Sequence, residues 1–157
     1  MSRTIWLSVC MFVVNGLVLF GQAPSAQAPA SQGLKVDTKG VTASILYEAV
    51  IAGGHIPEVR GKFKLRITEL VIAPGGYVGD HNHLGPGIRQ MTEGQMQYIM
   101  PDKTVVYRLG DYFFETGDVS HRVLNNSDKP NRHLLFEILP VDVAGPSLIP
   151  PRAAGRQ

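Results

Sequence analysis

The chain has 157 residues, of which 44% are hydrophobic, and its 15 basic and 13 acidic side chains give a formal charge of +2. This length suits one domain with a single buried core. The charges are spread without runs, which disfavours a nucleic-acid groove or a polybasic membrane patch and favours a small-molecule ligand.

The first thirty residues differ in composition from the rest of the chain. Arg3 precedes an apolar run at residues 5–20, and a stretch rich in alanine, proline and serine follows the run. This arrangement predicts a signal peptide over residues 1–30, cleaved after Ala28 or Ala30, and a periplasmic or secreted protein that does not stay in the membrane. The run is shorter than the roughly 18–20 residues that span a bilayer. The alternative is an uncleaved anchor.

Beyond residue 30, short apolar segments alternate with turn residues. Residues 31–61 make an N-terminal segment, within which residues 41–51 fit either a strand or a short helix. Strands are predicted at residues 62–73, 87–92, 95–100, 104–109, 111–115, 120–126 and 133–139. Glycine, proline, asparagine and aspartate separate them, which is typical of an all-β sandwich or barrel. Residues 141–157 are expected to form an extended or frayed tail.

Alternation along two of these strands predicts which side chains face the core. In the strand at 95–100 the predicted inward set is Met96, Tyr98 and Met100. In the strand at 133–139 the predicted inward set is Leu134, Phe136 and Ile138. His133 and Glu137 would then lie on the polar outer face.

Two histidines with one residue between them, His81 and His83, are the first candidate site residues. In an extended chain, residues i and i+2 point to the same side with Cα atoms about 6.6–7 Å apart. Both rings can therefore reach one ion at roughly 2.0–2.1 Å from each nitrogen. A third ligand must come from a neighbouring strand, and His121 is the candidate. His55, in a glycine-rich loop, and His133 are interpreted as structural.

These residues resemble the two sequence motifs of the cupins, a superfamily of small metal-binding β-barrels. The first motif is matched by Gly75, His81, His83 and Gly94, and the second by Gly110, His121 and Asn125. The resemblance spans about residues 62–140 and implies a small single-domain cupin-type (jelly-roll) β-barrel. It also implies a divalent metal ion, Fe, Mn, Ni or Zn, held by the three histidines. By analogy with the family, residues 41–51 could form the contact of a homodimer.

One residue of the first motif is missing. The family's glutamate ligand would fall at position 87 or 88, where this sequence has Gly87 and Ile88, and Glu93 lies too far along to replace it. The expected metal shell is therefore three histidines without a carboxylate. Three neutral imidazoles leave the full +2 charge of a divalent ion, which favours an anionic or chelating substrate.

Two polar side chains lie next to the missing glutamate. Arg89 could pair with a carboxylate of the substrate. Gln90 could instead act as a weak fourth ligand through its amide oxygen, and the sequence leaves open which of the two faces the pocket. Tyr98 is a further candidate for substrate binding.

Three-histidine cupins resemble thiol and diketone dioxygenases, so the resemblance implies an exported dioxygenase-like metalloenzyme that acts on a small anionic or chelating substrate. The sequence identifies no acidic residue as a catalytic base, so the catalytic residues are unassigned. That gap supports the alternative, a non-catalytic periplasmic cupin that binds a small molecule.

Overall fold

The computed structural model describes residues 35–151, and the predicted signal peptide and its cleavage site lie outside this range. The described residues form nine strands and no helix: β1 Thr38–Val50, β2 Phe63–His83, β3 Gly87–Glu93, β4 Gln95–Ile99, β5 Thr104–Arg108, β6 Tyr112–Glu115, β7 His121–Leu124, β8 Asn131–Pro140 and β9 Leu148–Ile149. No helix in this range is long and apolar enough to cross a membrane. The predicted all-β class is confirmed.

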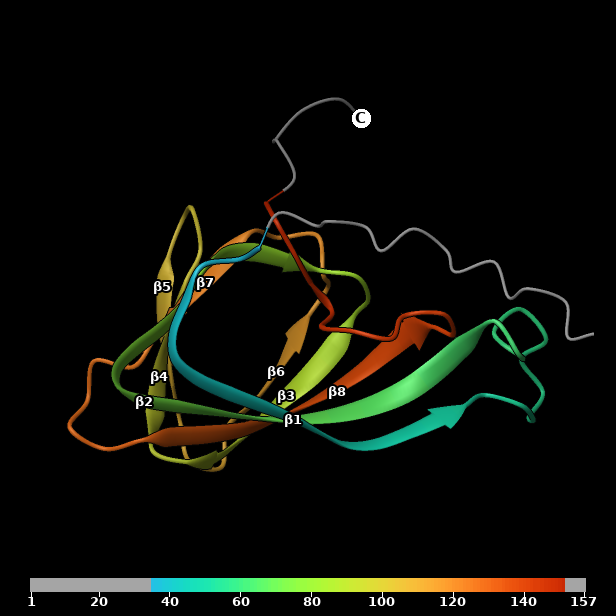
Figure 1. Cartoon of the computed structure of the whole chain (residues 1–157), viewed down its shortest axis with the longest axis horizontal. Helices are drawn as coiled ribbons and strands as arrows, with labels where there is room; N and C mark the ends of the chain where they lie inside the picture. The colour runs from blue at the N-terminus through green and yellow to red at the C-terminus, as the bar shows by residue number, and fades with distance from the viewer. Residues whose placement is uncertain (1–34, 152–157) are drawn as a thin grey trace, which may run out of the picture. The chain divides into compact units, whose positions relative to one another are not determined.

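The strands pair antiparallel in the order β5-β4-β7-β2-β8-β3-β6, with β1 and β9 also paired to β2. They make a nearly closed barrel, in which the long strand β2 belongs to both halves (Figure 1). The first part of β2 pairs with β1 and β8, and its last part pairs with β7 and β9. The chain turns between these parts at Gly75, whose φ of 69° suits glycine. Pairing of β2 stops at Ile72 and resumes at Tyr77 on the other side of this bend, and the second part of the strand ends in the two histidines.

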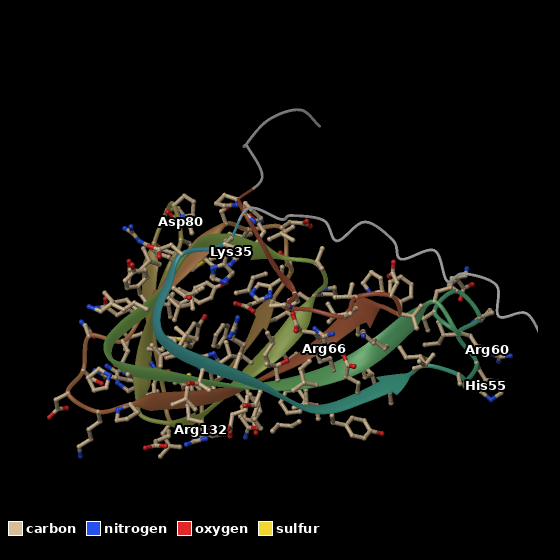
Figure 2. The ribbon with its side chains drawn as sticks, in the orientation of Figure 1. Lys35, His55, Arg60, Arg66, Asp80 and Arg132 are labelled. Carbon is tan, nitrogen blue, oxygen red and sulfur yellow. The ribbon has the colours of Figure 1, made fainter. Side chains whose placement is uncertain are left out.

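The N-terminal segment forms a strand rather than a helix. Strand β1 runs along β2 with Val41 opposite Ile72 and Tyr47 opposite Ile67. The loop that follows β1 carries His55 and Arg60. These two residues lie close together at the right-hand edge of Figure 2. His55 therefore takes no part in the histidine cluster described below.

The segment after β8 packs on the barrel as far as residue 151, which corrects the expectation of a frayed tail for this stretch. The Lys64 ammonium donates a hydrogen bond to the Val143 carbonyl, and the Arg66 guanidinium donates to the carbonyls of Gly145 and Val143. Ser147 is buried, and β9 pairs with the end of β2. The buried side chains of Lys64 and Arg66 thus bind the backbone of the C-terminal segment to the barrel.

The apolar core lies in the half of the barrel that contains β4 and β7. Its buried members are Ile72, Val78, Met91, Met96, Tyr98 and Val123. Met96 and Tyr98 were predicted to face inward, and Met100 packs against the same cluster from a partly buried position. The prediction for this strand is confirmed.

The prediction for β8 is wrong, because the strand has the opposite phase. Its buried residues are Asn131, His133, Leu135, Glu137 and Leu139, whereas Phe136 and Ile138 are 37% and 40% exposed. Leu134 is only partly buried. Both faces of β8 carry large apolar side chains. Alternation therefore shows which residues share a face, but not which face points into the barrel. In this half of the barrel the interior holds charged groups and the outer face is apolar.

Candidate metal centre

Three histidines from two neighbouring strands meet inside the barrel. His81 and His83 end β2, and His121 begins β7 directly opposite His81 in the strand register. All three side chains are buried, and one ring nitrogen from each lies within 4.8 Å of the others. The structure thus brings together all three residues that the sequence nominated, and together they could hold a metal ion.

Each of the three rings is oriented by a hydrogen bond from Nδ1. His81 Nδ1 donates to the Gly79 carbonyl at 2.7 Å, and His121 Nδ1 donates to the Val119 carbonyl at 3.0 Å. His83 Nδ1 lies 3.1 Å from the Glu137 carboxylate, which in turn accepts a hydrogen bond from Ser147 at 2.5 Å. With the proton on Nδ1, each Nε2 carries a lone pair, which is the tautomer that a metal ligand needs. In His83 this lone pair accepts a hydrogen bond from Arg89.

The environment keeps the His81 ring neutral. Burial, aided by the neighbouring His121, lowers the pKa of His81 to about 3. Tyr98 stacks on the His121 ring with centroids 4.2 Å apart, and burial together with the Glu115 carboxylate raises the pKa of its hydroxyl. Tyr98 therefore lines the site as a neutral phenol. Neutral imidazoles are the form that binds a cation.

A carboxylate that the sequence analysis did not identify lies beside the histidines. Glu115, at the end of β6, is buried with one carboxylate oxygen 3.1 Å from His121 Nε2 and the other 3.5 Å from His83 Nε2. Burial alone would raise the pKa of this carboxyl, but Arg89 and the two histidines outweigh that effect and hold it well below its usual value. The site therefore contains a carboxylate anion.

Arg89 is buried and points into the barrel. Its Nε lies 2.7 Å from a Glu115 oxygen, and its two terminal nitrogens donate to Nε2 of His133 at 2.7 Å and Nε2 of His83 at 3.1 Å. Burial and the Arg89 charge lower the pKa of His133 well below its usual value, so that ring accepts the hydrogen bond as a neutral base. The histidine predicted to lie on the outer face instead supports Arg89 inside.

Gln90 points the other way. Its amide donates a hydrogen bond to the hydroxyl of Tyr112 on the exposed side of β3. Strand alternation sends adjacent residues to opposite faces, so the inward position of Arg89 excludes Gln90 from the pocket. This placement corrects the expectation that Gln90 could be a fourth ligand.

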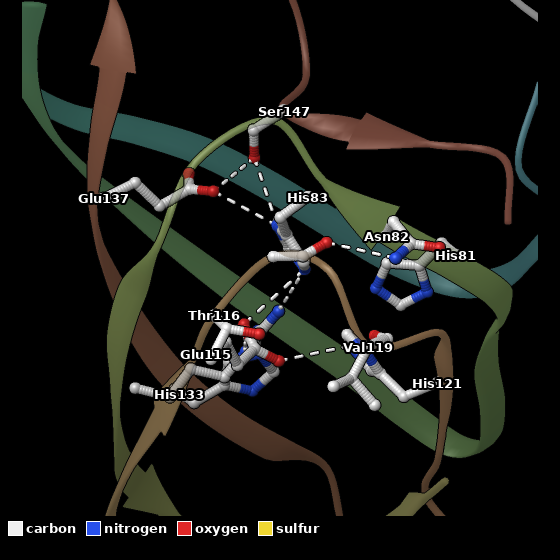
Figure 3. Close-up of polar contacts among 12 residues, drawn as sticks. His81, Asn82, His83, Glu115, Thr116, Val119, His121, His133, Glu137 and Ser147 are labelled. Atoms are coloured by element: carbon white, nitrogen blue, oxygen red, sulfur yellow. Dashed lines mark hydrogen bonds and ion pairs between the residues drawn. The ribbon is translucent and has the colours of Figure 1, made fainter. Parts of the chain in front are cut away.

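The donor set fits a divalent cation. The Nε2 atoms of His81 and His121 are buried, and neither has a well-aligned hydrogen-bond partner among the described residues. Both oxygens of Glu115 are also buried, and Arg89 pairs with one of them. Figure 3 shows the three rings facing one another, with Glu137 and Ser147 on one side of His83 and Glu115 on the other. Buried lone pairs without donors are costly unless a cation satisfies them.

Residues 68–137 match the family described as Cupin domain. This range contains all three histidines, Arg89 and Glu115. Over this range the chain is therefore similar to cupin domains.

Several solved structures share the cupin fold with this chain. The polyketide cyclase RemF from Streptomyces resistomycificus is 19% identical, with 70% of this chain and 77% of that chain covered and a TM-score of 0.50. A cupin-2 domain protein from Rhodospirillum rubrum is 14% identical, with 78% and 74% covered and a TM-score of 0.53. A cupin-like protein from Thermotoga maritima is 20% identical, with 68% and 75% covered and a TM-score of 0.50. At these identities the likeness concerns the fold. No curated protein matches the chain.

A cavity of about 320 Å³ adjoins the histidine cluster. His83, Glu137 and Ser147 lie at its polar end, and its other walls are largely apolar, with Leu70, Leu135 and Leu148 among them. This volume is at the lower end of the range of about 300–1,000 Å³ for small-molecule pockets. The C-terminal segment from Ala144 to Leu148 forms one wall.

Asn82, between the two β2 histidines, is a further residue that the sequence analysis missed. Its amide nitrogen donates to the carbonyls of Gly117 and Asp118, and its oxygen accepts from the Ser120 hydroxyl. These bonds fix the turn before β7, which carries the Val119 carbonyl that orients His121. Asn82 thus connects the end of β2, which carries His81 and His83, to the turn that precedes His121.

Proposed function

We propose that this cupin is a metal-dependent enzyme of dioxygenase type, in which His81, His83 and His121 hold one divalent ion and a small anionic or chelating substrate binds beside it. The observation that supports the proposal is that three buried imidazoles, each fixed through Nδ1, bring one ring nitrogen apiece within 4.8 Å of the others. When bound, the ion supplies Lewis acidity, and iron would add oxygen chemistry. The protein residues supply orientation and charge.

Arg89 gives the site its preference for an anion. Its guanidinium is buried, and its terminal nitrogen beside His83 can turn to a carboxylate or enolate oxygen of the substrate while Nε stays on Glu115. The adjoining cavity can hold an apolar body of modest size and exclude water from it. A small molecule with one acidic or chelating end and an apolar remainder fits both features.

A non-catalytic binding protein is the second candidate. Glu115 is paired with Arg89, and Glu137 is bonded to Ser147 and His83, so both buried carboxylates near the histidines are already engaged. Neither is free to act as a general base without losing a partner. A protein that captures its ligand without turnover needs no such base.

Metal analysis of protein purified without chelators or affinity metals tests the proposal. We expect about one divalent ion per chain, loss of that ion in His81→Gln, and retention in His55→Gln, which removes a histidine outside the cluster. An oxygen-uptake screen on iron-loaded protein then separates the two candidates. Turnover supports the enzyme, whereas bound metal without turnover on a broad set of carboxylates and diketones supports the binding protein. Metal-free protein that ignores added ions would refute both.

We also propose a homodimer formed through β1 and the apolar outer face of its sheet. Exposed side chains on this face include Tyr47, Leu65, Phe114, Phe136 and Ile138, and all five line one groove. Apolar patches of this kind are uncommon on monomers. Export through residues 1–30 remains part of the proposal, and N-terminal sequencing of the mature protein would test it.

A further inference from the structure

The position of the missing glutamate has a buried carboxylate on each side. Gly87 on β3 lies directly opposite Glu115 on β6 and, across the other edge of β3, opposite Glu137 on β8. Both glutamates are buried and point into the barrel. The three paired positions on β6, β3 and β8 therefore lie side by side in the barrel wall. The strands on either side of β3 supply the carboxylates.

Gly87 could not accommodate a side chain of its own. A Cβ at this position would lie 2.8 Å from the Phe136 carbonyl oxygen, 2.9 Å from a Leu135 methyl group and 3.2 Å from the Glu137 side chain. The first contact is with backbone, which cannot move without disturbing the β3–β8 pairing. A carboxylate beside Gly87 can therefore come only from a residue on a neighbouring strand.

The two glutamates face opposite sides of the same imidazole. Glu137 contacts His83 Nδ1, the nitrogen that points away from the cluster, and the Ser147 hydroxyl donates to it. Glu115 lies on the Nε2 side, 3.5 Å from His83 and 3.1 Å from His121. Only Glu115 is on the side where the three Nε2 atoms converge (Figure 3).

These separations match those of atoms that share an ion. Ligand bonds of about 2.0–2.2 Å at tetrahedral or octahedral angles put neighbouring ligand atoms roughly 2.8–3.6 Å apart. The distances from the Glu115 oxygens to Nε2 of His121 and His83 fall in this range. The group whose ligand atoms all lie within 4.8 Å of one another holds the three histidines without Glu115, so the carboxylate must turn toward His81 to complete the set. Arg89 holds one of these oxygens at 2.7 Å and so fixes the orientation of the carboxylate.

We propose that Glu115 is the fourth protein ligand of the metal and replaces, from β6, the glutamate that the first cupin motif lacks at Gly87. This inference rests on the proposed metal site. Arg89 is then a positioning residue for Glu115, and Glu137 is a positioning residue for His83. The carboxylate lowers the net charge of the three-histidine centre from +2 to +1.

Cobalt(II) binding to the purified protein tests the assignment without any enzymatic turnover. Glu115→Gln keeps the shape of the side chain but removes its charge, and we expect the dissociation constant for cobalt to rise about 100-fold or more. The visible absorption of bound cobalt should also change, because the ligand set changes. Glu137→Gln is the matched control: loss of a supporting group typically costs about 10–100-fold in affinity, and the cobalt spectrum should keep the wild-type shape.

Glu115→Gln leaves Arg89 buried without its anion, so the double variant Glu115→Gln/Arg89→Gln, which removes both charges, accompanies it. Thermal unfolding checks that each variant folds, and we expect the same spectral change in both. A wild-type cobalt spectrum and dissociation constant in the folded variants would show that Glu115 serves only as the partner of Arg89. That result would overturn this inference and leave the three-histidine site standing. Failure of the wild-type protein to bind cobalt would overturn the proposed function itself.

Discussion

Acidification of the metal-free protein should reveal the buried, neutral state of His81. Its pKa in the folded protein is about 3, because burial disfavours the charged ring, whereas an unfolded histidine has a pKa of about 6.5. Between these values the unfolded chain binds the proton and the folded chain does not. The free energy of unfolding therefore falls as the pH falls from about 6.5 to about 3.

The size of this effect follows from the two pKa values. Over the whole window the loss approaches about 5 kcal/mol, since one pKa unit corresponds to about 1.4 kcal/mol. Between pH 7.5 and pH 5.0 the loss from His81 alone is about 2 kcal/mol. This second figure depends little on the folded value, because the folded ring stays neutral at pH 5.0 for any pKa near 3.

The assay is urea unfolding in the presence of a chelator at pH 7.5 and pH 5.0, for the wild-type protein, His81→Gln and His55→Gln. The wild type should lose about 2 kcal/mol more than His81→Gln between the two pH values. Contributions from other groups cancel in this comparison. His55→Gln, which removes an exposed loop histidine, controls for the loss of a histidine from the chain.

Equal losses in the wild type and His81→Gln would refute the reasoning. They would mean that His81 takes up its proton in the folded protein as readily as in the unfolded chain. The ring would then not be the buried neutral base that a metal ligand must be, and the proposed centre would lose one of its three nitrogens.

Further changes test the packing and the assembly. Leu139→Ala, at a fully buried position of β8, should lower the free energy of unfolding by about 2–5 kcal/mol, measured in urea. Gly87→Ala should cost about 1–3 kcal/mol, because the new methyl group meets the Phe136 carbonyl; an unchanged unfolding midpoint would contradict the tight packing at β3. Phe136→Glu should give a monomer in light scattering where the wild type gives a dimer, and a monomeric wild type would rule out the proposed interface. Addition of zinc at 100 times its dissociation constant should raise the free energy of unfolding by about 2.7 kcal/mol, and no change in melting temperature would count against a metal site.

Local sequence signals were sufficient to locate the strand segments between residues 62 and 139 along the chain. Turn residues bound each apolar segment, and residue spacing alone puts His81 and His83 within reach of one ion. The spacing of the second motif nominated His121, which the β2–β7 pairing places opposite His81. These features are short-range, so a single segment of chain contains the information for each.

Glu115 could have been found from alternation in the strand 111–115. Phe113 is partly buried against the core, and Glu115 is two residues further along, so both share the inner face. No local pattern marks this carboxylate as part of a site, because its importance comes from Gly87 on another strand. Pairing between β3 and β6 joins the two positions.

The sequence by itself determined the strand segments between residues 62 and 139, the cupin-like motifs and the three histidines, because each depends on the spacing of residues along one chain segment. Only the tertiary structure decided that β8 turns His133 and Glu137 inward, that Arg89 rather than Gln90 faces the site, and that Glu115 lies beside the histidines. The reason is physical: alternation fixes two faces for every strand, but which face is inside depends on the neighbouring strands that close the barrel.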